Sequence, residues 1–305
     1  MTYQAIFTGW DDLTIEDLLV AYRKAKADSF FENTFPVAIK FAEYEQELLE
    51  NLQKLLDLLQ SEDGFSSNKK LIGKFRLLPK KLTTKKKHES QNGHVHFSNP
   101  KRAADHLFNN FDLIPEFRII GDFPVDSHII SALWINMVGH KFDASLDNCC
   151  YGARLKRIRN DELFSNEQDN PFQPYQKWRG DGLKAIRDEL EKDRDIIAAS
   201  LDLKSYYHFI DPLAITSDDL YNTLNIKLTE DEKAFTAQLA VFLKHWSDGA
   251  AAFGKKIAYK TPVINGGLVI GLTASRIISN ILLHHWDKLV IEKLSPIHYG
   301  RYVDE

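Results

Sequence analysis

Two acidic residues stand out as groups that could hold divalent metal ions. Asp202 lies near the end of the apolar run Ile196–Leu203, which has the length of a buried strand. Burying a carboxylate in apolar surroundings costs free energy unless a cation, a hydrogen-bond network or a metal ion compensates its charge. Asp304 lies in Tyr302-Val-Asp-Glu305, where an aromatic and β-branched strand pattern meets a turn. If the chain brings them together, the two carboxylates suit magnesium and two-metal phosphoryl transfer, although spacing alone also permits two unrelated residues.

Helical periodicity and turn signals predict the elements that would position these groups. Ser127 is the expected amino-terminal cap of its helix, and Thr229 and Glu232 are expected to form a capping box. The expected strand at 196–203 would deliver Asp202 from a buried sheet. The remaining expected elements are helices over 15–27, 37–60, 127–138, 182–192, 229–246 and 273–291, and a strand over 117–120.

A basic run covers Lys69 to Lys87 and contains nine lysines and arginines with no acidic residue. Phe75 lies within it. Such a run could track a phosphate backbone by releasing condensed counterions. It could equally be a flexible, solvated loop, because residues 83–93 are polar and poorly periodic.

Composition indicates a globular protein of a reducing compartment. The chain has 305 residues, 44% of them hydrophobic, and a formal net charge of -4. Its two cysteines are adjacent, Cys149 and Cys150, and chain neighbours rarely form a structural disulfide. We expect two small buried side chains there, and no zinc site, because no histidine has a partner at zinc spacing. Without a long apolar segment or signal peptide, a soluble cytoplasmic protein with no membrane contact is expected.

Three segments, in order, resemble the palm motifs of reverse transcriptases. Leu201–Ile210 resembles the first, in which an aromatic residue follows the aspartate by five positions. Gly267–Asn280 resembles the second, whose glycines let the backbone approach template and nucleotide. Tyr302–Glu305 is similar to the Tyr-x-Asp-Asp motif. The segments 126–134 and 151–155 resemble the fingers motifs, and 172–190 resembles the fingers-to-palm segment of bacterial defence-associated, abortive-infection-like reverse transcriptases.

The resemblance implies a role for each matching residue. Asp202 and Asp304 would be catalytic and hold two Mg²⁺ ions, with Mn²⁺ as a substitute, and Glu305 would assist them. Tyr207 would be the steric gate that favours deoxynucleotides. The remaining nucleotide-binding residues implied are Arg154, Lys156 and Gly271.

The implied architecture is α+β, a right-hand polymerase with fingers and palm. Its expected domains are a helical amino-terminal region with a basic loop at 1–110, fingers at 111–195 and palm at 196–305. The palm would be an antiparallel sheet backed by helices. Because the strand pattern at 299–305 has no strand after it, we expect a fragment that lacks the thumb.

The implied function is an RNA-directed DNA polymerase of an antiphage defence system. Its partners would be an RNA template or a dedicated non-coding RNA, deoxynucleotides, the DNA product, and a companion defence protein or a second copy of the chain. Val269-Ile270 stands where many reverse transcriptases have Pro-Gln, and Glu305 replaces the second aspartate. Those departures keep two alternatives open. One is a template-independent or protein-primed nucleotidyl transferase, and the other is a catalytically silent, RNA-binding scaffold.

Overall fold

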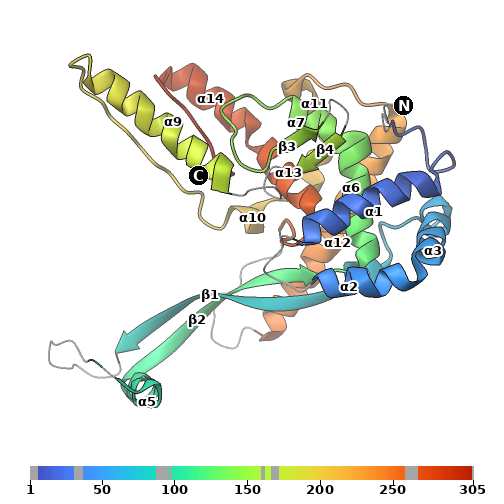
Figure 1. Ribbon diagram of the computed structural model, residues 1–305, viewed down its shortest axis with the longest axis horizontal. Helices are drawn as coiled ribbons and strands as arrows, with labels where there is room; N and C mark the ends of the chain where they lie inside the picture. Colours follow the sequence, from blue (N-terminus) through green and yellow to red (C-terminus); the bar gives the residue numbers. More distant parts are fainter. Residues whose placement is uncertain are drawn as a thin grey trace.

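The computed structural model describes residues 6–30, 37–86, 96, 98–158, 162–165, 172–257 and 267–303 (Figure 1). Within these ranges the chain is a mixed α and β structure that is mostly helical. None of the described helices combines the length and the apolar character that crossing a bilayer requires.

Helices build most of the described structure. Two short 3-10 segments lie at Glu45–Glu47 and Pro212–Thr216, and a π-helical turn lies at Ile135–Gly139. The α-helices are α1 (Ile15–Phe30), α2 (Val37–Tyr44), α3 (Leu48–Gln60), α4 (Lys69–Ile72), α5 (Pro100–Asn110), α6 (Val125–Trp134), α7 (His140–Ala144), α9 (Phe172–Leu190), α10 (Tyr206–Phe209), α11 (Asp218–Leu224), α12 (Glu230–Ile257), α13 (Thr273–Leu282) and α14 (His284–Leu294).

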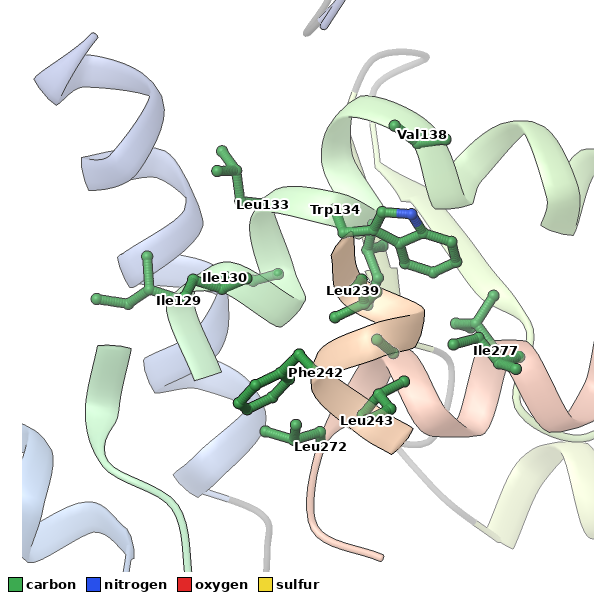
Figure 2. Packing of buried hydrophobic residues seen from close by; sticks show 14 of the residues in the cluster. Ile129, Ile130, Leu133, Trp134, Val138, Leu239, Phe242, Leu243, Leu272 and Ile277 are labelled. Atoms are coloured by element: carbon green, nitrogen blue, oxygen red, sulfur yellow. The ribbon is translucent and has the colours of Figure 1, made fainter. Parts of the chain in front are cut away.

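The main core forms where α6 packs against α1, α12 and α13. Figure 2 shows Trp134 of α6 beside Leu239 of α12 and Ile277 of α13. Trp134 is fully buried, and its indole Nε1 donates to Thr236 Oγ1 at 3.1 Å, so its one polar atom is satisfied. Ile129, Ile130 and Leu133 of the same helix are also buried.

The strongest local helix signals are confirmed. The helices predicted at 15–27 and 37–60 are present, although a 3-10 turn divides the second. The capping box also forms, because Glu232 N donates to Thr229 Oγ1 at 3.2 Å and Thr229 N donates to Glu232 Oε2 at 3.0 Å.

Two helix predictions are wrong in detail. Ser127 does not cap α6, which begins at Val125; its hydroxyl instead donates to Leu71 O at 2.6 Å. The long helix expected at 273–291 is broken at Leu283 into α13 and α14. Apolar periodicity continues across the break and therefore does not reveal it.

Much of the basic run is a strand instead of a loop. Strand β1 (Lys74–Lys86) pairs antiparallel with β2 (Phe111–Asp122), and α5 lies at the far end of this hairpin. The register shifts between Pro79 and Lys81, where a bulge accommodates the extra residue. Figure 1 shows the hairpin projecting from the helical body as a long arm. The second sheet pairs β3 (Leu155–Ile158) with β4 (Glu162–Ser165).

The strand expected at 196–203 is absent, and this prediction is wrong. The segment is extended but pairs with no described strand, and Ile197 is fully exposed. Asp202 is likewise exposed instead of buried. A strand needs a partner for its backbone hydrogen bonds, and the described residues supply none here. Among the described residues of 196–303 there is accordingly no palm sheet.

Asp28 of α1 should make stability depend on pH. Thr273 Oγ1 at the start of α13 donates to its Oδ2 at 2.7 Å, and burial raises the pKa of Asp28 from 3.8 to about 7. Between these two values the folded chain keeps a proton that the unfolded chain has lost. The free energy of unfolding therefore falls as the pH rises through that window.

Urea unfolding at about pH 5 and about pH 8 measures this effect against Asp28→Asn, which keeps the acceptor and cannot ionise. The variant should lose less stability than the wild type between the two pH values. An identical pH dependence in both proteins would contradict the assignment.

Candidate functional site

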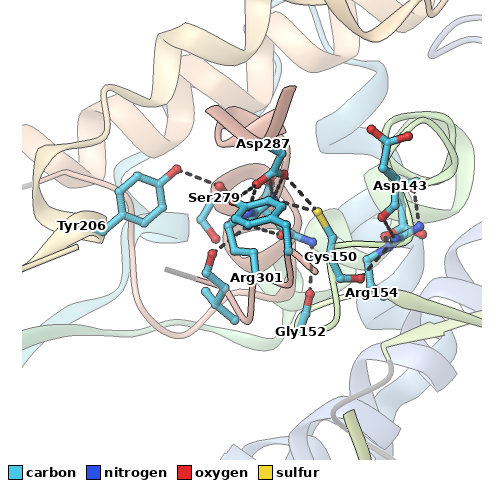
Figure 3. Close-up of polar contacts among 12 residues, drawn as sticks. Asp143, Cys150, Gly152, Arg154, Tyr206, Ser279, Asp287 and Arg301 are labelled. Atoms are coloured by element: carbon cyan, nitrogen blue, oxygen red, sulfur yellow. Dashed lines mark hydrogen bonds and ion pairs between the residues drawn. The ribbon is translucent and has the colours of Figure 1, made fainter. Parts of the chain in front are cut away.

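A buried arginine at the start of the Tyr302-Val-Asp-Glu segment organises the candidate site. The Arg301 side chain is 4% exposed and that of Asp287, on α14, is fully buried. Arg301 Nε donates to Asp287 Oδ1 and Nη2 donates to Oδ2, both at 2.7 Å. Burial is the largest single influence and would lower the pKa of Arg301, but the hydrogen bonds to Asp287 together with the electrostatic attraction of Asp287 and its neighbours raise that pKa above its ordinary value. This pair is a fixed, charge-assisted fork (Figure 3).

Helix α13 joins this pair to the segment that follows Asp202. Arg301 Nη1 donates to Asn280 Oδ1 at 2.7 Å, and the Tyr206 hydroxyl donates to the carbonyl of the preceding residue, Ser279, at 2.8 Å. Ser279 Oγ also donates to the Tyr207 hydroxyl at 2.8 Å. Two consecutive residues of α13, at the end of the second palm-like segment, therefore bind the first segment and the residue that directly precedes the third.

The Tyr151–Arg154 segment meets the same place through its backbone. Arg301 N donates to Cys149 O at 2.7 Å, and Tyr151 N donates to Arg301 O at 2.9 Å. Gly152 allows this approach, because a Cβ there would lie 2.8 Å from Val303 Cγ2.

Aromatic side chains of α9 also pack against the segment around Tyr302. Trp178 Nε1 donates to Gly300 O at 3.0 Å. The Tyr175 ring meets the Tyr302 ring edge to face, with centroids 5.4 Å apart. The fingers-like segments thus contact the start of the Tyr-x-Asp-Asp-like motif.

The predicted metal ligands are only partly described. Asp202 is exposed, and within the described part of the chain its carboxylate makes no hydrogen bond or ion pair. Its oxygens are therefore accessible to a hard cation such as Mg²⁺, and the predicted set with Asp304 and Glu305 consists of oxygen donors alone. Asp304 and Glu305 lie outside the described residues, so the distance between the carboxylates stays a prediction.

Two of the predicted nucleotide-binding residues, Tyr207 and Gly271, lie in segments that contact each other. Tyr207 is half-buried, and its carbonyl accepts from Leu268 N at 2.7 Å, which joins it to the glycine-containing segment. Gly271 is exposed and has a φ of 130°, a conformation that glycine adopts without strain. Gly271 itself lies against Gly121, because a Cβ there would be 2.9 Å from Gly121 O.

The other two predicted nucleotide-binding residues are not brought to Asp202 by any described contact. Arg154 Nε donates to Asp143 Oδ1 at 3.0 Å, and its Nη2 donates to Asp143 O at 2.9 Å, so the guanidinium caps the end of α7 (Figure 3). Lys156 lies in β3, opposite Phe164. Binding of phosphate by either residue stays a prediction.

The sequence predicted two small buried side chains at Cys149 and Cys150. In the structure, Cys150 also makes polar contacts. Both thiols are free, and the ligand atoms of Cys149, Cys150 and Asp287 lie within 4.8 Å of one another. Arg301 Nη2 donates to Cys150 Sγ at 2.9 Å, and that thiol donates to Asp287 Oδ2 at 3.2 Å. A side-chain hydrogen bond with Cys150 lowers the pKa of Cys149. A metal ion at this triad would have to displace the guanidinium from Asp287, which disfavours a cation there.

Sequence reasoning missed Asp287 and Asn280 as functional residues. A signal existed in the spacing, because positions 280, 284 and 287 fall on one face of the helix predicted over 273–291, and an acidic residue on a buried face needs a partner. The partner itself, Arg301, is not identifiable from helical spacing.

Comparison of the chain with models of known protein families, and with curated protein sequences, finds no match.

Replacing Asp287 by asparagine should release the segment around Arg301. The change leaves a buried guanidinium without its counter-charge, which costs about 3 kcal/mol or more. We expect amide hydrogen exchange at Tyr151 and Arg301, whose N–H groups bridge the two segments, to accelerate relative to the amides of α12.

Glu232→Gln is the matched control. Glu232 is also fully buried and ion-paired, with Lys141, but it does not contact residues 299–303. It should lower stability without selectively exposing the Tyr151 and Arg301 amides. Equal protection of these amides in wild type and Asp287→Asn would contradict their dependence on the ion pair.

Proposed function

We propose that this chain carries the catalytic machinery of an RNA-directed DNA polymerase that acts in antiphage defence. The observation that carries the proposal is the convergence on α13. Tyr206 and Tyr207, just after Asp202, and Arg301, just before Asp304, bind the consecutive residues Ser279 and Asn280. Segments recognised only by their order in the sequence are therefore neighbours in space.

The convergence supports the proposed metal site because it limits how far apart the two aspartates can lie. Asp304 is three residues beyond Arg301, and Asp202 is four residues before Tyr206. Arg301 Nη1 also donates to Val303 O at 2.7 Å, which fixes the backbone directly before Asp304. Short connections from fixed anchors allow both carboxylates to reach a common centre.

The proposed chemistry assigns a task to each group. Asp202 and Asp304 would hold two Mg²⁺ ions, with Glu305 close by. Ions at such a site promote attack by a 3′-hydroxyl and neutralise the pyrophosphate that leaves. The exposed backbone at Gly271 would let the nucleotide and template approach closely.

Tyr207 would select the sugar. Its hydroxyl accepts from Ser279 Oγ, and its backbone carbonyl accepts from Leu268 N, so both the ring and the main chain at this residue are held. A ring fixed in this way resists displacement by a ribose 2′-hydroxyl, and it thereby favours deoxynucleotides.

One observation favours the catalytically silent scaffold as a second candidate. Arg154 donates to Asp143 and to the carbonyls of Asp147 and Cys150, so its guanidinium is committed to the protein. A polymerase that uses Arg154 for the triphosphate would have to break these bonds when nucleotide binds. Antiphage protection and RNA binding that survive loss of Asp202 would support the scaffold.

Substitution of either proposed metal ligand should abolish synthesis. We expect Asp202→Asn and Asp304→Asn to reduce incorporation of labelled deoxynucleotides on an RNA template with Mg²⁺ to background. Asp195→Asn is the control, because Asp195 is exposed in the same connection and lies outside the motif. Undiminished incorporation by either ligand variant would refute the polymerase assignment.

Tyr207 variants test sugar selection separately. Tyr207→Ala removes the ring and should raise incorporation of ribonucleotides relative to deoxynucleotides. Tyr207→Phe keeps the ring, loses only the hydroxyl bonded to Ser279, and should preserve most of the discrimination. An unchanged ratio of ribonucleotide to deoxynucleotide incorporation in Tyr207→Ala would contradict the gating role of the ring.

A further inference from the structure

Positive charge is concentrated in the hairpin arm, defined here as residues 69–86 with 98–122. The arm contains eleven lysines and arginines and four acidic residues, a formal charge of +7. The whole chain has a formal charge of -4, so the other residues together are strongly acidic. An isolated cationic element on an acidic protein indicates an anionic partner for that element.

The cations of β1 are exposed and mostly uncompensated. Lys74, Lys80, Lys81 and Lys85 are exposed, and none of them forms an ion pair with a described residue. By contrast, Arg76, at the base of the arm, is paired with Asp122 at 3.0 Å.

Three of the four acidic residues of the arm lie opposite lysines of β1, and one of them, Asp122 opposite Lys74, is paired with Arg76. Glu116 and Asp112 lie opposite Lys81 and Lys85 in the register without closing an ion pair, so the lysine ammonium groups stay available to another anion.

The strand register gives the arm a charged face. Residues directly opposite one another in an antiparallel pair share a face, and side chains alternate along each strand. Lys74, Arg76, Lys81 and Lys85 therefore lie on one face with Arg118. From Lys74 to Lys85 this row extends about 35 Å, roughly one turn of a nucleic-acid duplex.

Where the arm joins the helical body, the aromatic ring on its opposite face is not free to stack on nucleobases. Phe75 packs against the rings of Trp246 and Phe253 on α12, with centroids 5.8 Å and 5.6 Å away. The one aromatic residue of the basic run therefore belongs to the core. Lysine contacts to phosphates remain, and these do not depend on the base sequence.

The arm begins beside the candidate site. Gly121 N, in β2, donates to Ile270 O at 3.0 Å, and this residue precedes the exposed Gly271. The same connection contacts Tyr207 through Leu268. A nucleic acid lying along the arm would therefore point to the glycine-containing segment.

We propose that the charged face of the arm binds the phosphate backbone of a double-stranded nucleic acid. The row length matches a duplex turn, and no aromatic residue of β1 or β2 shares the charged face with the lysines, which argues against a single strand held by base stacking. Binding requires neither the metal ions nor the polymerase reaction.

Fluorescence anisotropy with a labelled RNA duplex about two turns long tests the proposal between about 50 and 200 mM salt. The triple variant Lys74→Gln, Lys81→Gln, Lys85→Gln should bind about tenfold more weakly or worse, and the slope of log affinity against log salt should fall by about 2 to 3. Circular dichroism verifies that the variant is folded.

The matched control removes the same charge from exposed lysines outside the arm, with Lys54→Gln, Lys233→Gln and Lys244→Gln. It should bind within about twofold of wild type with an unchanged slope. Equal losses in both triple variants, or none in the arm variant, would overturn the proposal.

Two further outcomes are decisive. Preference for vesicles containing anionic lipid over the RNA duplex, lost in the arm variant, would identify a membrane surface and overturn the proposal. Tighter binding of single-stranded RNA through the same lysines would overturn the assignment to a duplex. A chain that binds duplex through the arm but incorporates no deoxynucleotide would support this inference and refute the polymerase assignment alone.

Discussion

The Arg301–Asp287 pair is the interaction on which the rest of the candidate site depends. A guanidinium buried with 4% exposure is tolerated only if its charge and its donors are satisfied. Arg301 meets this condition through Asp287, Asn280, Cys150 and the carbonyl of Val303. Because these partners come from different parts of the chain, satisfying one side chain fixes several segments at once.

The consequence is a site assembled around α13. Its residues Ser279 and Asn280 bind the tyrosines that follow Asp202 and the arginine that precedes Asp304. Asn280 Nδ2 also donates to Gly152 O at 3.1 Å, which adds the fingers-like segment. Toward the other end of the same motif, the Ile270 carbonyl accepts a hydrogen bond from Gly121 N at the base of the hairpin arm. Chemistry and nucleic-acid binding would thus be coupled through one helix and the connection before it.

Local sequence signals predicted what is local in the structure. The capping box at Thr229 and Glu232 needs only neighbouring residues and located the start of α12, although that helix continues to Ile257 instead of ending near 246. Amphipathic spacing was sufficient for α1. The strand expected at 196–203 failed because strand formation depends on a partner that the run itself does not specify. The Arg301–Asp287 pair was missed because it forms only when the chain returns after α14.

The central claim is that Asp202 and Asp304 share one metal centre. Crystals of the chain grown with Mn²⁺ and a deoxynucleotide, measured at the manganese absorption edge, locate the ions directly. The account predicts an anomalous peak with oxygens of both carboxylates about 2 Å from one ion. Peaks that contact only one aspartate, or that occupy the Cys149, Cys150 and Asp287 triad instead, would contradict it.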